Sequence, residues 1–192
     1  MTALLCALAL AAHAQEPKQQ TDAEKQMAAE MAMGEPAAEH ARLVALEGKW
    51  DVTARWFPAP GKKPMEFGGT AVNRMILGGR FLESSTTTKA DAVYESLTVF
   101  GFDRRRNEYT MIGFDSMGTY SISAAGVWDE KTSSIALGGA EADPGAKSVQ
   151  RYRLRIRQVT KDEYRMTMSF FLPDGSEWTA VESIYTRAGR HS

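Results

Sequence analysis

The chain has 192 residues and a formal net charge of −1, and 43% of its residues are hydrophobic. This length favours one domain with a tail, and the hydrophobic share is large enough for a packed core. A net charge close to zero gives no general attraction for nucleic acid or for an anionic membrane, so neither partner is expected.

The N-terminus predicts a secretory signal peptide over residues 1–14. Residues 3–12 are an unbroken apolar run, too short to span a bilayer as a helix, and Ala-His-Ala at 12–14 is a small-x-small cleavage site. A basic residue before the run, usual in such signals, is missing. We expect an exported protein, periplasmic or secreted, that begins near Gln15. The only cysteine, Cys6, lies inside the run, so no disulfide and no cysteine metal site are expected.

Residues 15–37 are predicted to form a flexible leader with a short helix. Thr21 matches an N-cap with Glu24 at position N3, which is the pattern of a capping box. Good helix formers follow, and Gly34 can end the helix. A second short helix is expected over about residues 38–46.

Residues 38–188 are predicted to form one mainly β domain, with residues 189–192 as a tail. Short apolar segments alternate with polar or glycine-rich turns, and no helix is expected between them. Such a meander predicts an antiparallel up-and-down β-barrel of about ten strands, because closure removes the sheet edges. The expected strands are 50–57, 65–77, 80–89, 95–102, 108–117, 119–128, 135–141, 149–159, 164–172 and 178–187.

The Gly78-Gly79 pair sets the register of one predicted hairpin. Glycine reaches φ > 0 without a Cβ penalty, so the pair favours a two-residue primed turn. The facing residues would be Leu77–Arg80, Ile76–Phe81, Met75–Leu82 and Arg74–Glu83. Opposite charges meet in the last pair, which supports this register.

The last three strands predict which side chains face the lumen. A two-residue loop between the eighth and ninth strands would put Ile156 opposite Thr167, on the wrong face, so a three-residue loop at 161–163 is preferred. The expected facing pairs include Ile156–Met168, Leu154–Phe170, Met168–Val181 and Phe170–Thr179. The inward set is then Tyr152, Leu154, Ile156, Met166, Met168, Phe170, Val181 and Tyr185, with Arg187 on the same parity.

Gly48, Trp50 and Arg187 resemble a pattern found in lipocalins and their calycin relatives. There, a Gly-x-Trp sequence near the start of the barrel meets an arginine from the last strand. The resemblance implies that Arg187 lies across the Trp50 ring as a cation–π contact and seals the barrel floor.

A longer resemblance is to a bacterial family called domain of unknown function 1579. The matching stretches are 43–50 (LVALEGKW), 56–61 (WFPAPG), 77–82 (LGGRFL), 101–103 (GFD), 114–119 (FDSMGT) and 184–187 (IYTR). The chain departs from the family at Phe102 and Phe114, where Tyr and Trp are expected, and in a shortened link at 90–94. The resemblance implies a calycin-like barrel and no particular reaction, because the family has no established activity.

The sequence offers little for catalysis or cofactor binding. All three histidines, His13, His40 and His191, lie outside the predicted strands, so no haem, zinc or other cofactor is expected. Asp115, with Arg80 as a counter-charge, is the best candidate for acid–base chemistry. The favoured alternative is that Asp115 caps a turn and Arg80 lies at the rim, because Asp hydrogen-bonds local backbone readily.

Four arginines, at 151, 153, 155 and 157, share the outer face of one predicted strand. Nucleic-acid binding is not favoured, because that face lacks aromatic residues for base stacking. We expect a solvated surface balanced by acids such as Glu182.

The leading hypothesis is that the lumen binds a small, largely apolar ligand. Such a site is expected to offer about 300 Å³ or more. Its residues would be Tyr152, Leu154, Met166, Met168, Phe170 and Tyr185, with Arg80 and Asp115 near the mouth. The main alternative is an interaction or stability module with a filled core, and an enzyme that uses Asp115 and Arg80 is the least favoured.

Overall fold

The computed structural model describes residues 21–89, 92–143 and 147–189. The chain divides into two compact units, residues 1–32 and 33–192. The predicted signal peptide lies outside the described residues.

Helix α1 spans Asp22–Met33 and begins with the predicted capping box. The Glu24 amide donates to Thr21 Oγ1 at 3.3 Å, and the Thr21 amide donates to Glu24 Oε2 at 2.7 Å. The helix ends one residue before Gly34, as predicted.

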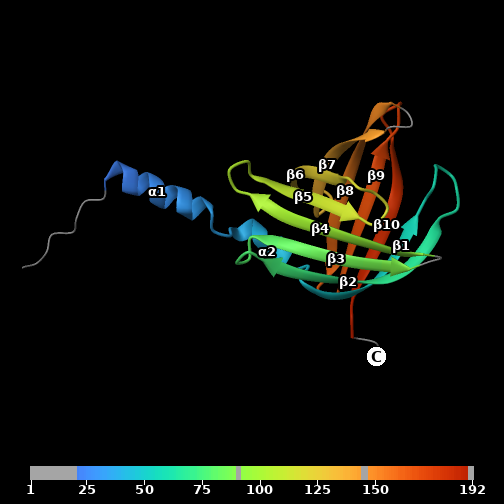
Figure 1. Cartoon of the computed structure of the whole chain (residues 1–192), viewed down its shortest axis with the longest axis horizontal. Helices are drawn as coiled ribbons and strands as arrows, with labels where there is room; N and C mark the ends of the chain where they lie inside the picture. Colours follow the sequence, from blue (N-terminus) through green and yellow to red (C-terminus); the bar gives the residue numbers. More distant parts are fainter. Residues whose placement is uncertain (1–20, 90–91, 144–146, 190–192) are drawn as a thin grey trace, which may run out of the picture. The chain divides into compact units, whose positions relative to one another are not determined.

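Ten antiparallel strands form a closed barrel in which each strand pairs with the next and β10 returns to β1 (Figure 1). The predicted meander and its strand number are therefore confirmed. The strands are β1 Gly48–Trp56, β2 Met65–Ile76, β3 Phe81–Lys89, β4 Val93–Asp103, β5 Glu108–Asp115, β6 Ser121–Asp129, β7 Ser134–Asp143, β8 Ser148–Thr160, β9 Glu163–Phe171 and β10 Glu177–Arg187.

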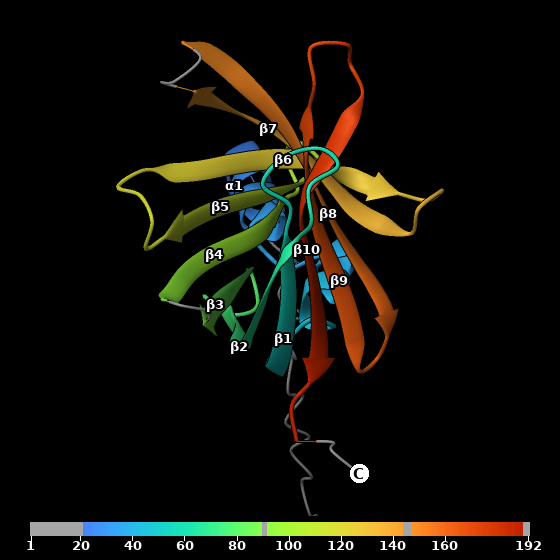
Figure 2. The ribbon, with the colours of Figure 1, turned by 90° about the vertical axis from the view of Figure 1, so that its right-hand side faces the viewer.

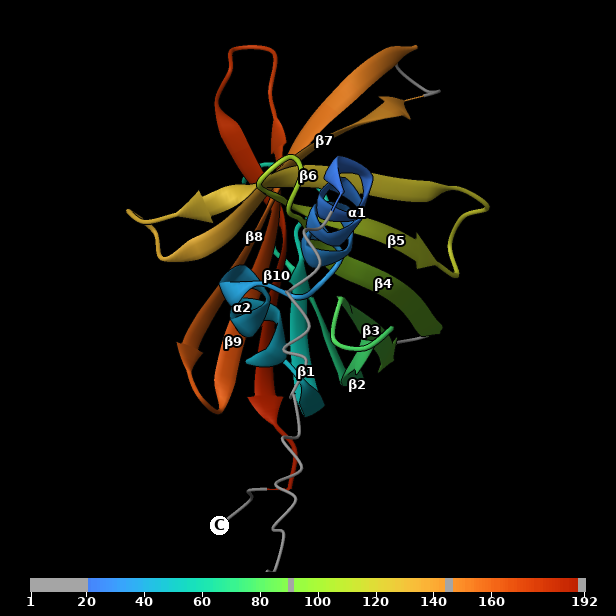
Figure 3. The ribbon, with the colours of Figure 1, turned by 90° about the vertical axis from the view of Figure 1, so that its left-hand side faces the viewer.

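The turns of the meander alternate between the two ends of the barrel. The β2–β3, β4–β5, β6–β7 and β8–β9 turns share one end, which we call the closed end. A 3₁₀ turn, η1 Ala38–His40, and helix α2, Ala41–Val44, occupy the predicted second helix and cover this end (Figure 3). Leu43 and Leu46 from this segment are buried in the barrel core. The β1–β2, β5–β6 and β9–β10 turns lie at the other end, which we call the open end, and the β1–β2 loop faces the viewer in Figure 2.

The β2–β3 hairpin has the predicted register but a different turn. The pairs Ile76–Phe81, Met75–Leu82 and Arg74–Glu83 are confirmed. However, Leu77, Gly78 and Gly79 all have positive φ, and the amides of Gly79 and Arg80 both donate to the Ile76 carbonyl at 3.2 Å. The connection is thus a four-residue loop, and the predicted Leu77–Arg80 pair is wrong.

The β8–β9 connection corrects the predicted loop length. Thr160 pairs directly with Glu163, so the loop has two residues, and the register shifts between Gln158 and Thr160. This irregularity, typical of a β-bulge, places Ile156 opposite Met166 and Leu154 opposite Met168. The predicted partners are wrong by two residues. A displacement by two residues keeps the same side chains on the same face of the sheet. The predicted inward face of β8 is therefore still the buried one.

A second shift occurs between β9 and β10. Met168 faces Val181 as predicted, but Phe170 faces Trp178 rather than Thr179. The cause is a register irregularity between Thr179 and Val181, which no turn rule could reveal from the sequence.

Candidate functional site

Four side chains from the closed end inward form what we call the aromatic column: Arg187, Trp50, Tyr164 and Tyr185. Arg187 Cζ lies 4.2 Å from the Trp50 ring centroid, so the expected cation–π contact is present. The Trp50 and Tyr164 rings then meet edge to face, with their centroids 4.8 Å apart and an angle of 86° between their planes. The Tyr164 ring stacks on the Tyr185 ring, with centroids 4.1 Å apart and an angle of 9° between the ring planes.

Backbone carbonyls fix the closed-end part of this column. Arg187 Nη1 donates to the Glu47 carbonyl, and Nη2 donates to the Lys161 carbonyl, both at 3.0 Å. Gly48 has φ +133°, and a Cβ there would overlap Arg187 Nη1. The Gly-x-Trp pattern therefore has a physical basis, because only glycine combines this backbone conformation with room for the arginine.

A cavity of about 40 Å³ lies inside the barrel beside Tyr164 and Tyr185. It is much smaller than the predicted site of about 300 Å³. A buried water needs about 10–15 Å³ on this measure, so the cavity has room for roughly three waters. The lining residues are Leu46, Asn73, Leu82, Ser84, Thr86, Ser96, Thr98, Phe100, Ile156, Tyr164, Met166 and Tyr185.

Hydroxyl and apolar side chains both line the cavity. Strands β3 and β4 contribute four hydroxyl side chains, Ser84, Thr86, Ser96 and Thr98, which we call the hydroxyl wall. The facing strands β8 and β9 contribute Ile156, Tyr164 and Met166. Strands β3 and β4 also contribute the apolar residues Leu82 and Phe100, so the cavity offers both apolar and hydrogen-bonding contacts.

Asn73 joins the cavity to the covering segment. Its Nδ2 donates to the Leu46 carbonyl at 2.9 Å and to the Tyr164 hydroxyl at 3.0 Å. Its Oδ1 is buried and is one of the few buried polar atoms without a hydrogen-bond partner among the described residues.

The tyrosines of the cavity are neutral. Burial raises the pKa of Tyr185 to about 12. Burial, with the neighbouring Tyr185, raises the pKa of Tyr164 well above its ordinary value. No residue that lines the cavity is charged.

The residues predicted to line the lumen are only partly brought together. Met166 and Tyr185 line the cavity. Tyr152 and Leu154 are buried in the core, where the Tyr152 hydroxyl donates to the Ser123 carbonyl at 2.8 Å. Two further predicted residues, Met168 and Phe170, are partly buried and pack against that core without lining the cavity.

Arg80 and Asp115 lie at opposite ends of the barrel, so the expectation that both flank one mouth is wrong. Arg80 follows β2 at the closed end, where it binds the Gly34 carbonyl at 2.7 Å and the Glu35 carboxylate at 2.9 Å. Arg80 thus anchors the segment that covers the barrel. The error arose because turns after even and odd strands of a meander fall at different ends.

Asp115 ends β5 at the open end and behaves as a turn cap, in line with the favoured alternative. Its Oδ1 accepts the Met117 amide at 2.8 Å. The Asp115 carboxylate also accepts a hydrogen bond from Tyr94. The pKa of Tyr94 is raised to about 12, mainly by burial and to a lesser extent by the negative charge of Asp115.

Sequence reasoning missed Asn73 and the hydroxyl wall. The signal was present, because the confirmed Met75–Leu82 pair sets the inward parity of both strands. Counting by twos from Leu82 gives Ser84 and Thr86, and from Met75 it gives Asn73. The stretch was overlooked because it has polar residues on both faces.

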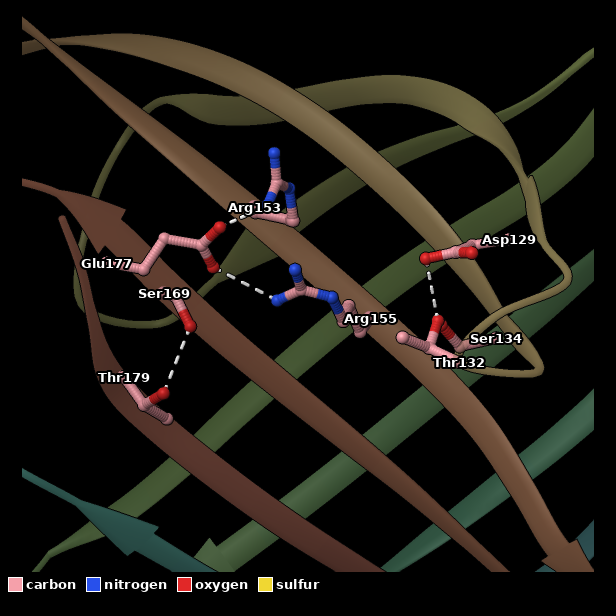
Figure 4. Close-up of polar contacts among 8 residues, drawn as sticks. All are labelled: Asp129, Thr132, Ser134, Arg153, Arg155, Ser169, Glu177 and Thr179. Atoms are coloured by element: carbon pink, nitrogen blue, oxygen red, sulfur yellow. Dashed lines mark hydrogen bonds and ion pairs between the residues drawn. The ribbon is translucent and has the colours of Figure 1, made fainter. Parts of the chain in front are cut away.

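The basic outer face of β8 is balanced by an acid other than the expected one. Arg153 and Arg155 both form ion pairs with Glu177, the latter at 3.0 Å (Figure 4). The expected partner, Glu182, instead pairs with Arg55 at 3.2 Å.

Within the described ranges, no group of three or more His, Cys, Asp or Glu side chains is placed to hold a metal ion. None of the described helices combines the length and apolar character needed to cross a membrane.

Comparison with known proteins identifies the sequence family and the fold. The model of the family described as "Protein of unknown function (DUF1579)" matches residues 35–187. The crystal structure of Rv2717c from M. tuberculosis is similar with a TM-score of 0.55 and 17% identity, and the match covers 80% of this chain and 99% of that one. At this identity the likeness concerns the fold alone. No curated protein matches the chain.

Proposed function

This chain belongs to the DUF1579 family of proteins of unknown function, and we propose that it binds a small, largely apolar ligand inside its barrel. The observation that carries the proposal is a cavity inside the barrel that is lined by both apolar and hydroxyl side chains. Small hydroxyl side chains leave volume that larger apolar side chains would fill in a core selected only for packing.

The size of the cavity limits the ligand. A volume of about 40 Å³ suits a molecule of a few non-hydrogen atoms. A longer ligand requires Met166 to change rotamer, which its unbranched and flexible side chain permits.

The second candidate is the filled-core module, and the small cavity volume favours it. In that case the cavity holds only ordered water, which hydrogen-bonds to otherwise unpaired buried polar groups. The two candidates differ in one measurable property, which is saturable binding of a small apolar probe.

Replacing Ser84 with leucine is expected to weaken ligand binding by filling the cavity. The matched control is Ser85→Leu, because Ser85 is the exposed neighbour on the other face of β3. The probes are 1-pentanol and its isomer butyl methyl ether, titrated by protein NMR. Native protein and Ser85→Leu should show saturable shifts at cavity residues, and Ser84→Leu should bind at least about tenfold more weakly, because the volume is lost.

If neither probe shifts the cavity residues of the native protein saturably, ligand binding is wrong and the filled-core module is supported. Equal binding by the Ser84 and Ser85 variants would place the ligand elsewhere on the protein.

We also propose that the protein is exported to the periplasm or secreted. The support is the apolar run at residues 3–12 and the Ala-His-Ala site that follows it. N-terminal sequencing of the protein from its native host should find a start near Gln15. A cytoplasmic protein that retains residues 1–14 would contradict this proposal.

A further inference from the structure

We infer that the open end of the barrel docks on an anionic lipid surface, with apolar side chains in the bilayer interface and lysines beside the headgroups. The surface concerned is one arc of the open end. It is formed by the β1–β2 and β5–β6 turns and by the ends of β3 and β4 that lie between them. This docking does not require a ligand in the cavity, because it involves the outside of the barrel.

Large apolar side chains are exposed around this arc. Those with exposed fractions from 42% to 83% form what we call the apolar rim: Trp56, Met65, Val93, Phe114, Met117 and Tyr120. Every Trp, Phe or Tyr side chain that is fully exposed within the described ranges belongs to this rim, namely Trp56, Phe114 and Tyr120. Exposed apolar side chains gathered at one place mark a site for a partner or a membrane.

Strand pairing brings members of the apolar rim together. Trp56 lies opposite Met65 where β1 and β2 enter their loop, which faces the viewer in Figure 2. Ser116 donates its amide to the Glu95 carbonyl at 2.9 Å, and its hydroxyl accepts the Glu95 amide at 3.0 Å. These two bonds hold the β5–β6 turn, and Met117 with it, against the start of β4. The rim therefore follows neighbouring strand ends.

Three exposed lysines flank the apolar rim. Lys62 and Lys63 lie in the β1–β2 loop, and Lys89 ends β3. Among the residues that the structure describes, the lysines in ion pairs are Lys25 and Lys161, and neither belongs to this arc. The three ammonium groups are therefore available to an anionic partner.

The carboxylates near the rim are mostly bound within the protein. Asp115 Oδ1 accepts the Met117 amide at 2.8 Å, and Glu66 Oε1 lies 3.8 Å from Arg55 Nε. Among the described acids of the arc, only the side chain of Glu95 has no partner of this kind. The arc is thus locally basic, although the net charge of −1 gives the whole chain no general attraction for an anionic membrane.

Aromatic side chains beside lysines favour a lipid surface over a protein surface. Trp and Tyr side chains are enriched at the interface of a bilayer, and lysines near an anionic membrane add electrostatic attraction. Protein–protein interfaces are instead depleted of lysine. We therefore expect the apolar rim to insert shallowly, with the lysines at the level of the headgroups.

The first test is cosedimentation of the native protein with two kinds of vesicle. One contains equal parts of phosphatidylglycerol and phosphatidylcholine, and the other contains phosphatidylcholine alone. Binding to the anionic vesicles should be saturable and should weaken as salt is added. Binding to the neutral vesicles should be at least about tenfold weaker, because the attraction of the lysines is lost.

The variant Met117→Ser tests the apolar rim. Its matched control is Leu77→Ser, because Leu77 is also a turn residue and is 69% exposed, but lies at the closed end. Met117→Ser should bind anionic vesicles about three- to tenfold more weakly than the native protein, since one apolar side chain no longer enters the interface. Leu77→Ser should bind like the native protein.

The double variant Lys62→Ser/Lys63→Ser tests the charges. Its control is Lys49→Ser/Lys161→Ser, which removes the same charge from exposed residues at the closed end. The first variant should bind anionic vesicles about ten- to thirtyfold more weakly and neutral vesicles as the native protein does. The control should keep native affinity for both.

Several outcomes would overturn the inference. These are no saturable binding to anionic vesicles, equal affinity for the two kinds of vesicle, or equal losses in the rim variants and their controls. A native dimer that Met117→Ser dissociates, with no vesicle binding, would also overturn it, because the rim would then be an interface between copies. If a variant fails to fold, the native comparison of the two vesicles still decides. Binding of 1-pentanol is measured separately, so a failure here is distinct from a failure of ligand binding in the cavity.

Discussion

Replacing Arg187 with alanine should lower the free energy of unfolding by about 1–3 kcal/mol, the range for loss of a partly buried polar network. The change removes the cation–π contact with Trp50 and the hydrogen bonds to two carbonyls. It also removes an ion pair, because Arg187 Nε lies 3.4 Å from Asp162 Oδ1. Chemical denaturation, followed by tryptophan fluorescence and by circular dichroism, measures the effect.

Arg74→Ala is the matched control for this experiment. Arg74 also forms an ion pair across two strands, at 2.8 Å to Glu83, but its side chain is 66% exposed. Exposed pairs contribute about 0–1 kcal/mol, so this variant should stay close to the native protein. If Arg187→Ala is no less stable than Arg74→Ala, the aromatic column is not a structural element of the barrel.

Gly139→Ala is expected to lower the free energy of unfolding by about 1–3 kcal/mol, as overpacking of a core does. Gly139 lies opposite Tyr152 in the β7–β8 pair. A Cβ at this glycine would overlap the Tyr152 ring and would lie 2.6 Å from the Ser123 carbonyl oxygen. That oxygen accepts the Tyr152 hydroxyl, so the added methyl group would also disturb this hydrogen bond.

The preceding glycine supplies the control. A Cβ at Gly138 meets no atom within 4 Å, so Gly138→Ala should be neutral or should stabilise by about 0.4–1 kcal/mol through the unfolded chain. Thermal and urea unfolding of the two variants gives the comparison. Similar stability of both would mean that Tyr152 does not require the space beside Gly139.

Much of the fold was predictable because period-two patterns and turn residues act locally. Alternation in β8 identified its buried face correctly, and the Gly78-Gly79 pair, supported by the charges of Arg74 and Glu83, gave the register of β2 and β3. The Trp50–Arg187 contact could be expected from a short motif, since glycine at 48 leaves room for the arginine.

The rest depended on features that the sequence marks weakly or not at all. The shift between Gln158 and Thr160 leaves the alternation of side chains in β8 intact, so no pattern reveals it. The hydroxyl wall has no hydrophobic signature, because β3 is polar on both faces beyond Leu82. Arg80 and Asp115 were placed together by their neighbouring glycines, although the topology puts them at opposite ends.

The most direct test of lumen binding is a crystal structure of the native protein soaked with 1-pentanol at saturating concentration. Ligand density should occupy the cavity lined by Ser84 and Met166. A cavity that holds only water at saturating probe, or one that is packed closed, would contradict the account.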